Sequence, residues 1–527
     1  MNKLLSLKDF GLVGIIGDLK PYEIPQNAFS SGLNYRIVNN TILSYNGSFA
    51  VSTPPTNINA GLIVPVFSTG FLFYLLLGLT KAYGYNGTAW GDVTSLAGYA
   101  ALSSGDELKW NGCQMGLIAI VNNPKSNIEY WNPLSITQIL QPLKFDAVNT
   151  WAAKGFKCKV IRAHKTFLFA LSLTEGATKL PDSYRWSHPA DINGLPFSWD
   201  ETDLASVAGK ASVGEGGELM DGLTLRNSFA LYSNQAVHLL DEIPSELIFS
   251  KRKLSSNFGL AATNALTSAI SNHYFLTDGD ILVNDGNSLK SILTNKLKKK
   301  LASGLDALTI GNSYAVTNPV AKEVWVCVPE IGHDLPNLAY IYNWEFDSVS
   351  LREIPANISR LAYGKTLVNP GTLTSAVTWA SSSGNWTAQR YGWGGLGDPT
   401  FFLNGLLSSN NSTSAVRSLI KDDQSAPLNT LLERIGLQLE SIEQVSTIVR
   451  VYPHISSPGN VSFQFGSQMF PNDNVTWQSP VTFTPNTQRK IDLLITGMLF
   501  SFRVLSVGSN SFEFTGIDFE YVNNGAR

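Results

Sequence analysis

The side chains that could do chemistry are spread thinly along this chain. Zinc and similar sites usually need at least one closely spaced pair of ligands, and the six histidines stand apart: His164, His188, His238, His273, His333 and His454. The three cysteines are also distant from one another and odd in number: Cys113, Cys158 and Cys327. We therefore expect buried free thiols rather than disulfides, and the sequence predicts no metal ion and no cofactor.

Catalytic motifs are also missing from the sequence, which contains no GxSxG, no HExxH and no phosphate-binding Gly-x-x-x-x-Gly-Lys-[Ser/Thr]. Formal carboxylate pairs exist at Asp278 with Asp280 and at Asp422 with Asp423. Two carboxylates about 5 to 10 Å apart can cleave a glycoside, but Asp is also a common turn-capping residue, which is the interpretation we favour. We expect no enzymatic activity.

The densest basic run, residues 296–300, offers a candidate contact site. The candidate residues are Lys296, Lys298, Lys299 and Lys300. Closely spaced ammonium groups can neutralise successive phosphates, so the run could touch DNA or a neighbouring subunit; a solvated loop or helix face is the plainer alternative. The whole chain has 38 Lys and Arg against 41 Asp and Glu, which argues against a protein that grips nucleic acid by broad phosphate neutralisation.

The elements that must position these residues are mainly strands. Charged residues make up only 15% of the 527 residues, and Asn, Ser, Thr and Gly take their place, which favours strands and turns. Short apolar runs, such as 71–77 and 116–121, recur between turn residues. Residues 82–93 and 339–351 resemble each other, since both contain Ala-Tyr-x-Tyr-Asn. Close spacing fits a propeller or a sandwich, and the loose repetition favours a β-propeller.

We expect four segments and a mainly β fold class: a β-propeller with an additional C-terminal β domain and an irregular N-terminal segment. The N-terminal arm covers residues 1–50 and the propeller covers 51–370. Polar stretches of small residues predict a linker over 371–424. A C-terminal β domain occupies 425–527, close to the commonest domain size, and could pack with the N-terminal arm.

One apolar stretch, residues 61–79, has about the 20 residues that a bilayer requires. Pro65 and Gly70 interrupt it, so two buried strands around a turn explain it better. The leading Leu4-Leu5-Ser6-Leu7 is cut short by Lys8, which leaves no apolar core for a secretion signal. We expect no membrane insertion and synthesis in a reducing cytosol.

Four groups of residues, taken in their order along the chain, resemble the sequence pattern of a known family. The opening group comprises Pro21, Ile24-Pro25, Ala28, Asn34-Tyr35-Arg36, Leu43 and Gly47. The second comprises Trp110-Asn111-Gly112, Asn122-Asn123-Pro124 and Tyr130-Trp131. The third, and most specific, is Arg185-Trp186-Ser187-His188-Pro189-Ala190-Asp191, followed by Pro196 and Ser198-Trp199-Asp200. The last comprises Lys322-Glu323-Val324-Trp325-Val326, Tyr342-Asn343-Trp344, Gly466-Ser467-Gln468, Pro471, Trp477, Arg503 and Gly516-Ile517-Asp518.

In this order the groups resemble the tail nozzle, or tail tubular protein B-like, proteins of short-tailed bacteriophages. The resemblance covers nearly the whole chain, although the Gly-Arg expected before Arg503 is here Gly497-Met498-Leu499. It implies a structural virion protein of the phage tail that is made in the host cytoplasm. It further implies a β-propeller in each subunit of a homohexameric ring, placed below the portal and adaptor, whose central channel conducts or retains the genome.

The implied partners are the portal-adaptor ring, tail fibre or tail-tip proteins, and genomic DNA touched transiently and non-specifically in the channel. A low net charge suits a conduit, because a strongly basic wall would hold the phosphates. The basic run 296–300 would then lie at a rim or against a neighbouring subunit.

The alternative function is a glycan-binding or glycan-cleaving β-propeller that recognises a host receptor. The 12 Trp and 18 Tyr residues could supply stacking platforms for sugar rings, although packing in the core is their commoner use. A third class, a nucleic-acid-binding regulator, would need a basic face and a recognised module, and the sequence offers neither.

Overall fold

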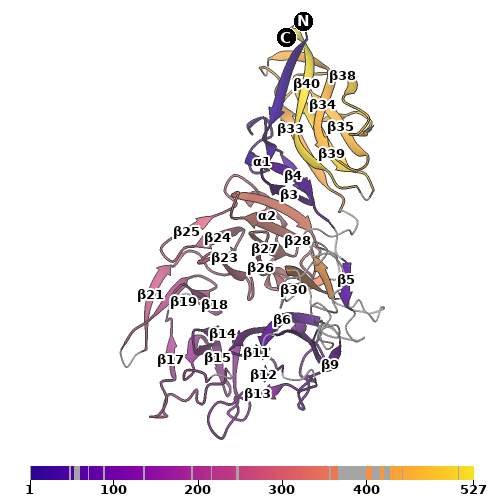
Figure 1. Cartoon of the computed structure of the whole chain (residues 1–527). Coiled ribbons are helices and arrows are strands. Elements are labelled where there is room, and N and C mark those ends of the chain that lie inside the picture. The colour runs from indigo at the N-terminus through magenta and orange to yellow at the C-terminus, as the bar shows by residue number, and fades with distance from the viewer. Residues whose placement is uncertain are drawn as a thin grey trace, which may run out of the picture.

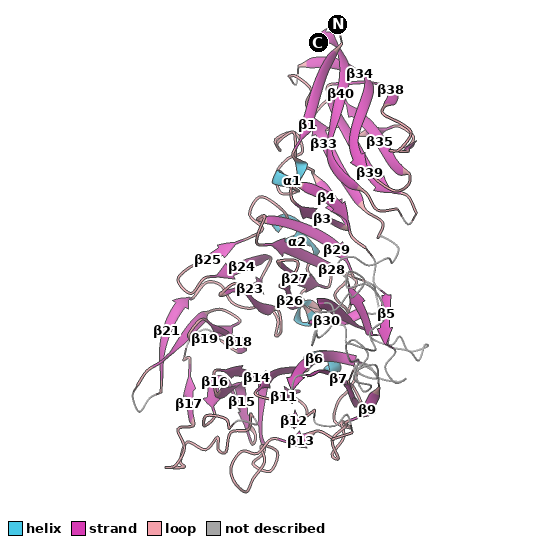
Figure 2. Cartoon of the chain, viewed as in Figure 1, coloured by secondary structure: helices cyan, strands magenta, loops and turns pink. Residues whose placement is uncertain are grey.

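Strands dominate the structure, as the composition predicts. The computed structural model describes residues 2–46, 49–52, 60–68, 71–86, 89–133, 137–191, 194–214, 217–244, 248–354, 358–365, 399–405, 416–419, 428–441, 443–508 and 510–526. Helices within these residues are short (Figure 1, Figure 2): α1 (Phe10–Val13), α2 (Lys298–Gly304) and the 3-10 helices η1 (Asp106–Lys109) and η2 (Ile310–Asn312). The mainly β prediction is confirmed.

The middle of the chain forms seven four-stranded antiparallel sheets among the described residues. We call them ring sheets 1 to 7. Ring sheets 1 to 3 contain β6 (Ala60–Ser68), β7 (Phe71–Gly78), β8 (Ala82–Tyr85) and β9 (Trp90–Asp92); β10 (Asn111–Met115), β11 (Ile118–Asn122), β12 (Glu129–Trp131) and β13 (Gln141–Pro142); and β14 (Phe156–His164), β15 (Phe167–Glu175), β16 (Thr178–Trp186) and β17 (Gly209–Ser212).

Ring sheets 4 to 7 follow the same plan. They contain β18 (Leu219–Leu225), β19 (Ser228–Ser233), β20 (Val237–Glu242) and β21 (Phe249–Ser255); β22 (Leu266–Ala269), β23 (Asn272–Thr277), β24 (Asp280–Asn284) and β25 (Leu289–Ser291); β26 (Tyr314–Asn318), β27 (Glu323–Val328), β28 (Leu338–Asn343) and β29 (Ser348–Glu353); and β30 (Ile358–Lys365), β31 (Pro399–Gly405), β32 (Val416–Leu419) and β5 (Phe49–Ser52).

The ring sheets touch one another in a closed circuit. The first strand of each sheet contacts the first strand of the next, from β6 through β10, β14, β18, β22, β26 and β30, and β30 contacts β6 again. A sheet placed between two others is covered on both faces, so its inner strands are mostly apolar. Every residue of β11 and of β27 is accordingly buried, which explains the continuous apolar runs of the sequence.

The two similar sequence stretches occupy equivalent places. Residues 82–93 contain β8 and β9, and residues 339–351 lie in β28 and β29. These are the third and fourth strands of ring sheets 1 and 6. The repetition in the sequence thus reflects a repeated hairpin.

The apolar stretch 61–79 also has a plain structural role. It provides most of β6 and β7, which pair antiparallel with Val66 opposite Phe73. None of the helices in the described part of the chain is long and apolar enough to span a bilayer.

The two ends of the chain combine in two six-stranded sheets at one end of the molecule (Figure 1). We call this part the terminal unit. Its first sheet contains β1 (Lys3–Lys8), β3 (Tyr35–Val38), β4 (Thr41–Ser44), β34 (Gln444–Ser456), β38 (Ile491–Gly497) and β40 (Glu513–Ala526). Its second sheet contains β2 (Ser31–Leu33), β33 (Leu431–Leu437), β35 (Val461–Gln468), β36 (Thr476–Trp477), β37 (Val481–Phe483) and β39 (Leu499–Ser506).

The N-terminal strands pair with and pack against the C-terminal strands of the terminal unit. β1 runs antiparallel along β40, and this approach requires Gly516, because a Cβ there would lie 2.6 Å from the Leu7 carbonyl oxygen. Phe10 and Phe29 are fully buried, and both rings pack against Phe514 at 5.4 and 5.7 Å. Burying one such ring stabilises a fold by about 1.5 to 3 kcal/mol, so residues 2–46 are an integral part of this unit.

The segment boundaries can be compared with these sheets. The predicted N-terminal arm, 1–50, supplies four strands of the terminal unit and the start of β5. The predicted linker, 371–424, contains β31 and β32, which pair with β30 and β5 in ring sheet 7. The other residues of that range lie outside the described residues.

Candidate functional site

The predicted basic run lies where the terminal unit meets the ring sheets. α2 begins at Lys298, and the carboxylate of Asp18 accepts hydrogen bonds from the backbone amides of Lys298 at 3.0 Å and Lys299 at 2.8 Å. The amide of Gly17 donates to the Lys296 carbonyl at 2.6 Å. Asp18 is 8% exposed. The N-terminal segment therefore supplies the cap that α2 lacks in its own sequence.

The lysine side chains mostly make contacts within the chain. Lys296 donates to the Asp347 carbonyl at 2.6 Å, and Lys298 forms an ion pair with Asp280 at 2.6 Å. Lys299 donates to the Asp18 carbonyl. The Lys300 side chain is exposed and makes no hydrogen bond or ion pair with another described residue, although the Lys300 carbonyl accepts from the Ser303 hydroxyl at 3.2 Å. The structure thus brings three of the four predicted residues into one intramolecular junction, and contact with DNA or a neighbouring subunit stays a prediction.

Buried polar groups form a second link of this junction. Arg36 of β3 pairs with Glu323 of ring sheet 6 at 2.6 Å, and the Glu323 side chain is 1% exposed. The hydroxyl of Tyr35 donates to the Val349 carbonyl at 2.9 Å. Burial lowers the pKa of the nearby Arg352 to about 10, and the charge of Arg36 acts in the same direction. Breaking a buried ion pair usually costs several kcal/mol, so these contacts hold the two parts in one orientation.

The first residues of the family resemblance, Pro21 and Ile24-Pro25, contact the C-terminal part of the chain. The buried guanidinium of Arg434 donates to the carbonyl of Pro21 at 2.7 Å and to that of Ile24 at 3.3 Å. Gly436 has φ +70°, and a Cβ there would lie 3.1 Å from the Pro21 carbonyl carbon. The C-terminal part of the chain therefore binds the segment that contains Pro21 and Ile24-Pro25, by hydrogen bonds from Arg434 and close packing at Gly436.

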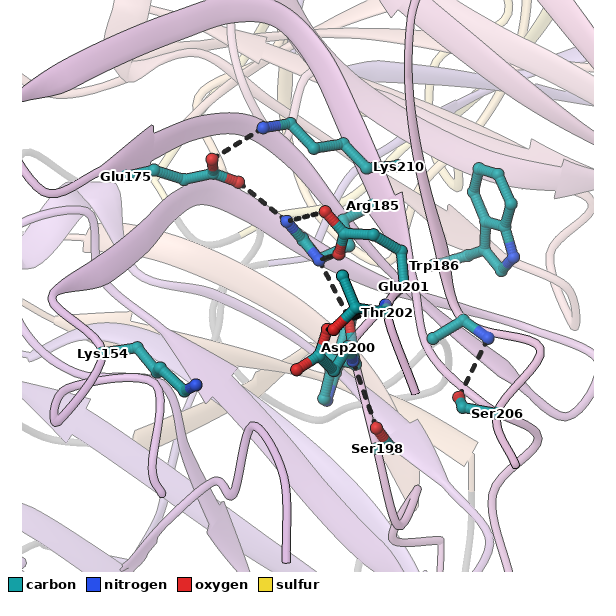
Figure 3. A network of polar contacts seen from close by, with 12 residues as sticks. Lys154, Glu175, Arg185, Trp186, Ser198, Asp200, Glu201, Thr202, Ser206 and Lys210 are labelled. Atoms are coloured by element: carbon teal, nitrogen blue, oxygen red, sulfur yellow. Dashed lines mark hydrogen bonds and ion pairs between the residues drawn. The ribbon is translucent and has the colours of Figure 1, made fainter. Parts of the chain in front are cut away.

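A second candidate site surrounds Arg185, in the most specific of the resembling segments (Figure 3). The Arg185 side chain is 2% exposed and pairs with Glu175 at 2.9 Å and with Glu201. It also donates to the Trp199 carbonyl at 2.9 Å, while Lys210 pairs with Glu175 at 2.6 Å. Burial alone would raise the pKa of Glu175, but hydrogen bonds from Lys210 and Arg185 lower it. Arg185 thus anchors the long connection between β16 and β17.

The anchored connection borders a hollow and exposes a leucine. The hollow measures about 520 Å³ and is lined by Trp186, Glu201 and β17 residues. Gly209 is required there, because a Cβ would lie 2.1 Å from the Trp186 ring. Leu204, at the tip of the connection, is fully exposed. Hydrogen bonds from the Thr202 amide and hydroxyl to Asp200 support the turn at this tip.

A third polar cluster lies where the ring sheets converge. Arg162 of β14 pairs with Asp221 of β18 at 2.8 Å, with side chains 9% and 1% exposed. Asn264, just before β22, accepts from Arg162 at 2.9 Å and donates to the Trp110 carbonyl at 3.3 Å. Arg360 of β30 donates to the Leu108 carbonyl at 2.6 Å. The Arg162–Asp221 pair joins the neighbouring ring sheets 3 and 4. The other contacts reach between parts of the circuit that are not neighbours, so these side chains meet at its centre.

Sequence reasoning missed the third polar cluster and a second basic run. The third polar cluster left no distinctive signal, because Arg162 shares β14 with Lys157, Lys159 and His164. A second basic run, Lys251-Arg252-Lys253, lies on β21 at the margin of ring sheet 4. Lys251 donates to the Val213 carbonyl at 2.8 Å, and Arg252 pairs with Asp241 at 2.9 Å. Cations on an edge strand oppose pairing with foreign strands.

The cysteines and potential ligands can be placed directly. Cys158 and Cys327 are buried free thiols, as predicted, and Cys113 is a half-buried free thiol. Burial raises the pKa of the Cys327 thiol to about 12. Within the described ranges, no three His, Cys, Asp or Glu side chains gather in a group that could hold a metal ion.

Comparisons with known proteins give structural neighbours only. No family model and no curated protein matches this chain. The extracellular domain of a protein described as the one component system BT4673 from B. thetaiotaomicron is 9% identical, with a TM-score of 0.37, over 69% of this chain and 39% of that chain. The Neurospora crassa Pan2 WD40 domain is 8% identical, with a TM-score of 0.36, over 70% of this chain and 91% of that chain. Similarity at this level carries no argument about function.

Proposed function

We infer first that the seven ring sheets are the blades of one seven-bladed β-propeller. The support is the closed circuit of first-strand contacts, in which β30 returns to β6. β5, which precedes ring sheet 1 in the chain, completes ring sheet 7 by pairing with β32. A strand shared in this way ties the two ends of the circuit together, as a radial array of four-stranded sheets requires.

We propose that the chain is a structural subunit of a phage tail. Six copies would form a ring-shaped nozzle that continues the portal-adaptor channel and conducts or retains genomic DNA. The sequence resemblance points to this family, and one structural observation supports it best: buried polar contacts join the terminal unit rigidly to the ring sheets through Asp18 and Arg36. A wall built from repeated subunits needs this fixed orientation, because flexible parts would spoil the repetition of their contacts.

The same proposal fixes the partners and the location. The subunit would contact further copies of itself, the portal-adaptor ring and tail fibre or tail-tip proteins, and DNA would touch the channel wall only transiently. The protein would act in the virion after synthesis in the host cytoplasm. A net charge of −3 favours such a wall, because phosphates would slide past it rather than bind.

The glycan-directed alternative has weaker support. Stacking on a sugar ring needs an aromatic face open to solvent, whereas the Trp and Tyr side chains in the described ranges are buried or half-buried. Trp186, beside the hollow of ring sheet 3, is 9% exposed and donates its indole N–H to the Val207 carbonyl at 2.9 Å. Packing accounts for these aromatic residues.

Electron microscopy with mass measurement tests the proposal, using the purified protein alone and mixed with candidate adaptor rings from the same source. We expect a ring of six copies whose central hole admits duplex DNA, roughly 20 Å or wider given the dimensions of its grooves. A stable monomer that ignores every adaptor ring but binds or cleaves host glycans would overturn the proposal.

A further inference from the structure

Three strands of the first sheet of the terminal unit have one neighbour each among the described strands: β3, β1 and β38. β1 pairs only with β40, and β38 pairs only with β34, among the strands that the structure describes. Figure 2 shows β1 and β38 at opposite margins of the unit. The unpaired N–H and C=O groups of an edge strand are a template for another strand, so this sheet can be extended beside β1 and beside β38. On β38 the Leu494 carbonyl already accepts a hydrogen bond from the Gln478 side chain at 3.1 Å.

The outward face of this sheet is polar in the middle and apolar at its margins. Arg450 on β34 forms ion pairs with Asp492 at 3.0 Å and with Glu520 at 3.4 Å. Leu4 on β1 is 63% exposed, and Leu494 on β38 is 72% exposed. The register places Leu4 opposite Glu520, on the face that carries Arg450. The two exposed leucines of the face therefore lie on the edge strands β1 and β38.

We propose that β1 of one subunit pairs antiparallel with β38 of the next subunit. The inference rests on the proposed ring and names the surface that closes it. Strand directions alternate from β1 through β40 and β34 to β38, so a neighbour's β38 placed beside β1 continues the alternation. The two edges are different surfaces, and a contact between different surfaces closes into a ring when its rotation allows.

Charge selects one register for this pairing. The Lys8 side chain is exposed and interacts electrostatically with Asp518 of its own subunit. The Asp492 side chain pairs with Arg450 and Lys490 and is still 63% exposed. Placing Lys8 opposite the neighbour's Asp492 sets Ser6 opposite Leu494 and leaves Leu4 diagonal to Leu494, a separation of about 7 to 8 Å that long side chains bridge. The register with Leu4 opposite Leu494 would instead set Lys8 against Lys490, two like charges.

Disulfide trapping tests this pairing on the full chain. Ser6→Cys combined with Leu494→Cys should, in the assembled and oxidised protein, give a ladder of covalent multimers that reductant removes. A bond within one subunit is excluded, because two strands separate β1 from β38 and put the two positions about 14 Å apart. Ser6→Cys combined with Thr447→Cys is the matched control, since Thr447 lies on the inner strand β34, and it should give no ladder.

The possible results distinguish failure of the β1–β38 pairing from failure of the proposed nozzle function. Rings that assemble without a ladder, from this pair and from Leu4→Cys with Leu494→Cys, would overturn the edge pairing and leave the proposed nozzle standing. A chain that stays monomeric at all concentrations and on adaptor rings would overturn both. Lys8→Glu should also weaken subunit association about twofold to fivefold per contact. Lys179→Glu, on the outside of ring sheet 3, should not change it, and unchanged association of Lys8→Glu would contradict the register.

Discussion

The carboxylate of Asp18 caps α2 by accepting a hydrogen bond from the backbone amide of Lys299, 281 positions later in the sequence, at 2.8 Å. The same carboxylate accepts from the amide of Lys298. The acceptor belongs to the segment that leads into the terminal unit, and the donors belong to α2, which connects ring sheets 5 and 6. One buried carboxylate therefore joins the two parts of the molecule.

Replacing Asp18 should loosen this junction. Asp18→Ala removes the acceptor for two amides of a short helix, and we expect a loss of about 1 to 3 kcal/mol in the free energy of unfolding. Hydrogen exchange should rise first at the amides of residues 298–301. Asp334→Ala is the control, because Asp334 is exposed and its side chain makes no hydrogen bond or ion pair with another described residue; it should change stability by less than about 0.5 kcal/mol. Equal losses in both variants would contradict the capping role.

The buried His273 predicts a loss of stability at mildly acid pH. Its Nε2 lies 2.9 Å from the Thr224 carbonyl and its Nδ1 lies 3.0 Å from the Tyr232 hydroxyl. Burial lowers the pKa of His273 from 6.5 to about 4. A group whose pKa is lower in the folded state stabilises the fold above its unfolded pKa. That stability declines as pH falls from about 6.5 to 4, by on the order of 3 kcal/mol.

His273→Gln should remove this part of the pH dependence. Urea unfolding at pH 7, 5.5 and 4.5 measures it, and the variant should lose less stability over this range than the original protein. His333→Gln is the control at an exposed histidine and should leave the slope unchanged. An unchanged slope in His273→Gln would show that another group, such as the buried His164, accounts for the acid sensitivity.

The sequence predicts the local structure of this chain better than its long-range pairing. The run 116–121 and the hairpin 82–93 correctly predict strands, because a strand covered on both faces is mostly apolar. The pairing of β1 with β40, in contrast, joins residues whose positions differ by more than 500, and no local pattern of a single sequence records it. The same limit hid the contact between Asp18 and the basic run, although the run itself was evident.

The network around Arg185 should be sensitive to a change that keeps its charge. Lysine cannot reach Glu175, Glu201 and the Trp199 carbonyl together, because it lacks the planar fork of donors. We expect Arg185→Lys to lower the free energy of unfolding by about 2 kcal/mol, a reduced figure because both glutamates are partly exposed. Arg252→Lys, in the exposed pair with Asp241, should cost less than about 0.5 kcal/mol. Urea unfolding followed by tryptophan fluorescence compares the two, and a similar small loss in both would contradict the anchoring role.

Substitutions in the hairpin turn between β22 and β23 should stabilise the protein. Ala269 pairs with Asn272, which leaves Ile270 and Ser271 as a two-residue turn with φ of +45° and +60°. Positive φ at both positions favours Asn-Gly and strains a β-branched residue, and Ile270 gains little from packing because it is 65% exposed. Ile270→Asn combined with Ser271→Gly should therefore raise the free energy of unfolding by about 1 to 2 kcal/mol.

The reverse change tests the same physics in the next turn of this sheet: Gly279 has φ +72°, so Gly279→Ser should destabilise by about 1 kcal/mol. A destabilised Asn-Gly variant would mean that Ile270 contributes contacts that outweigh its backbone strain.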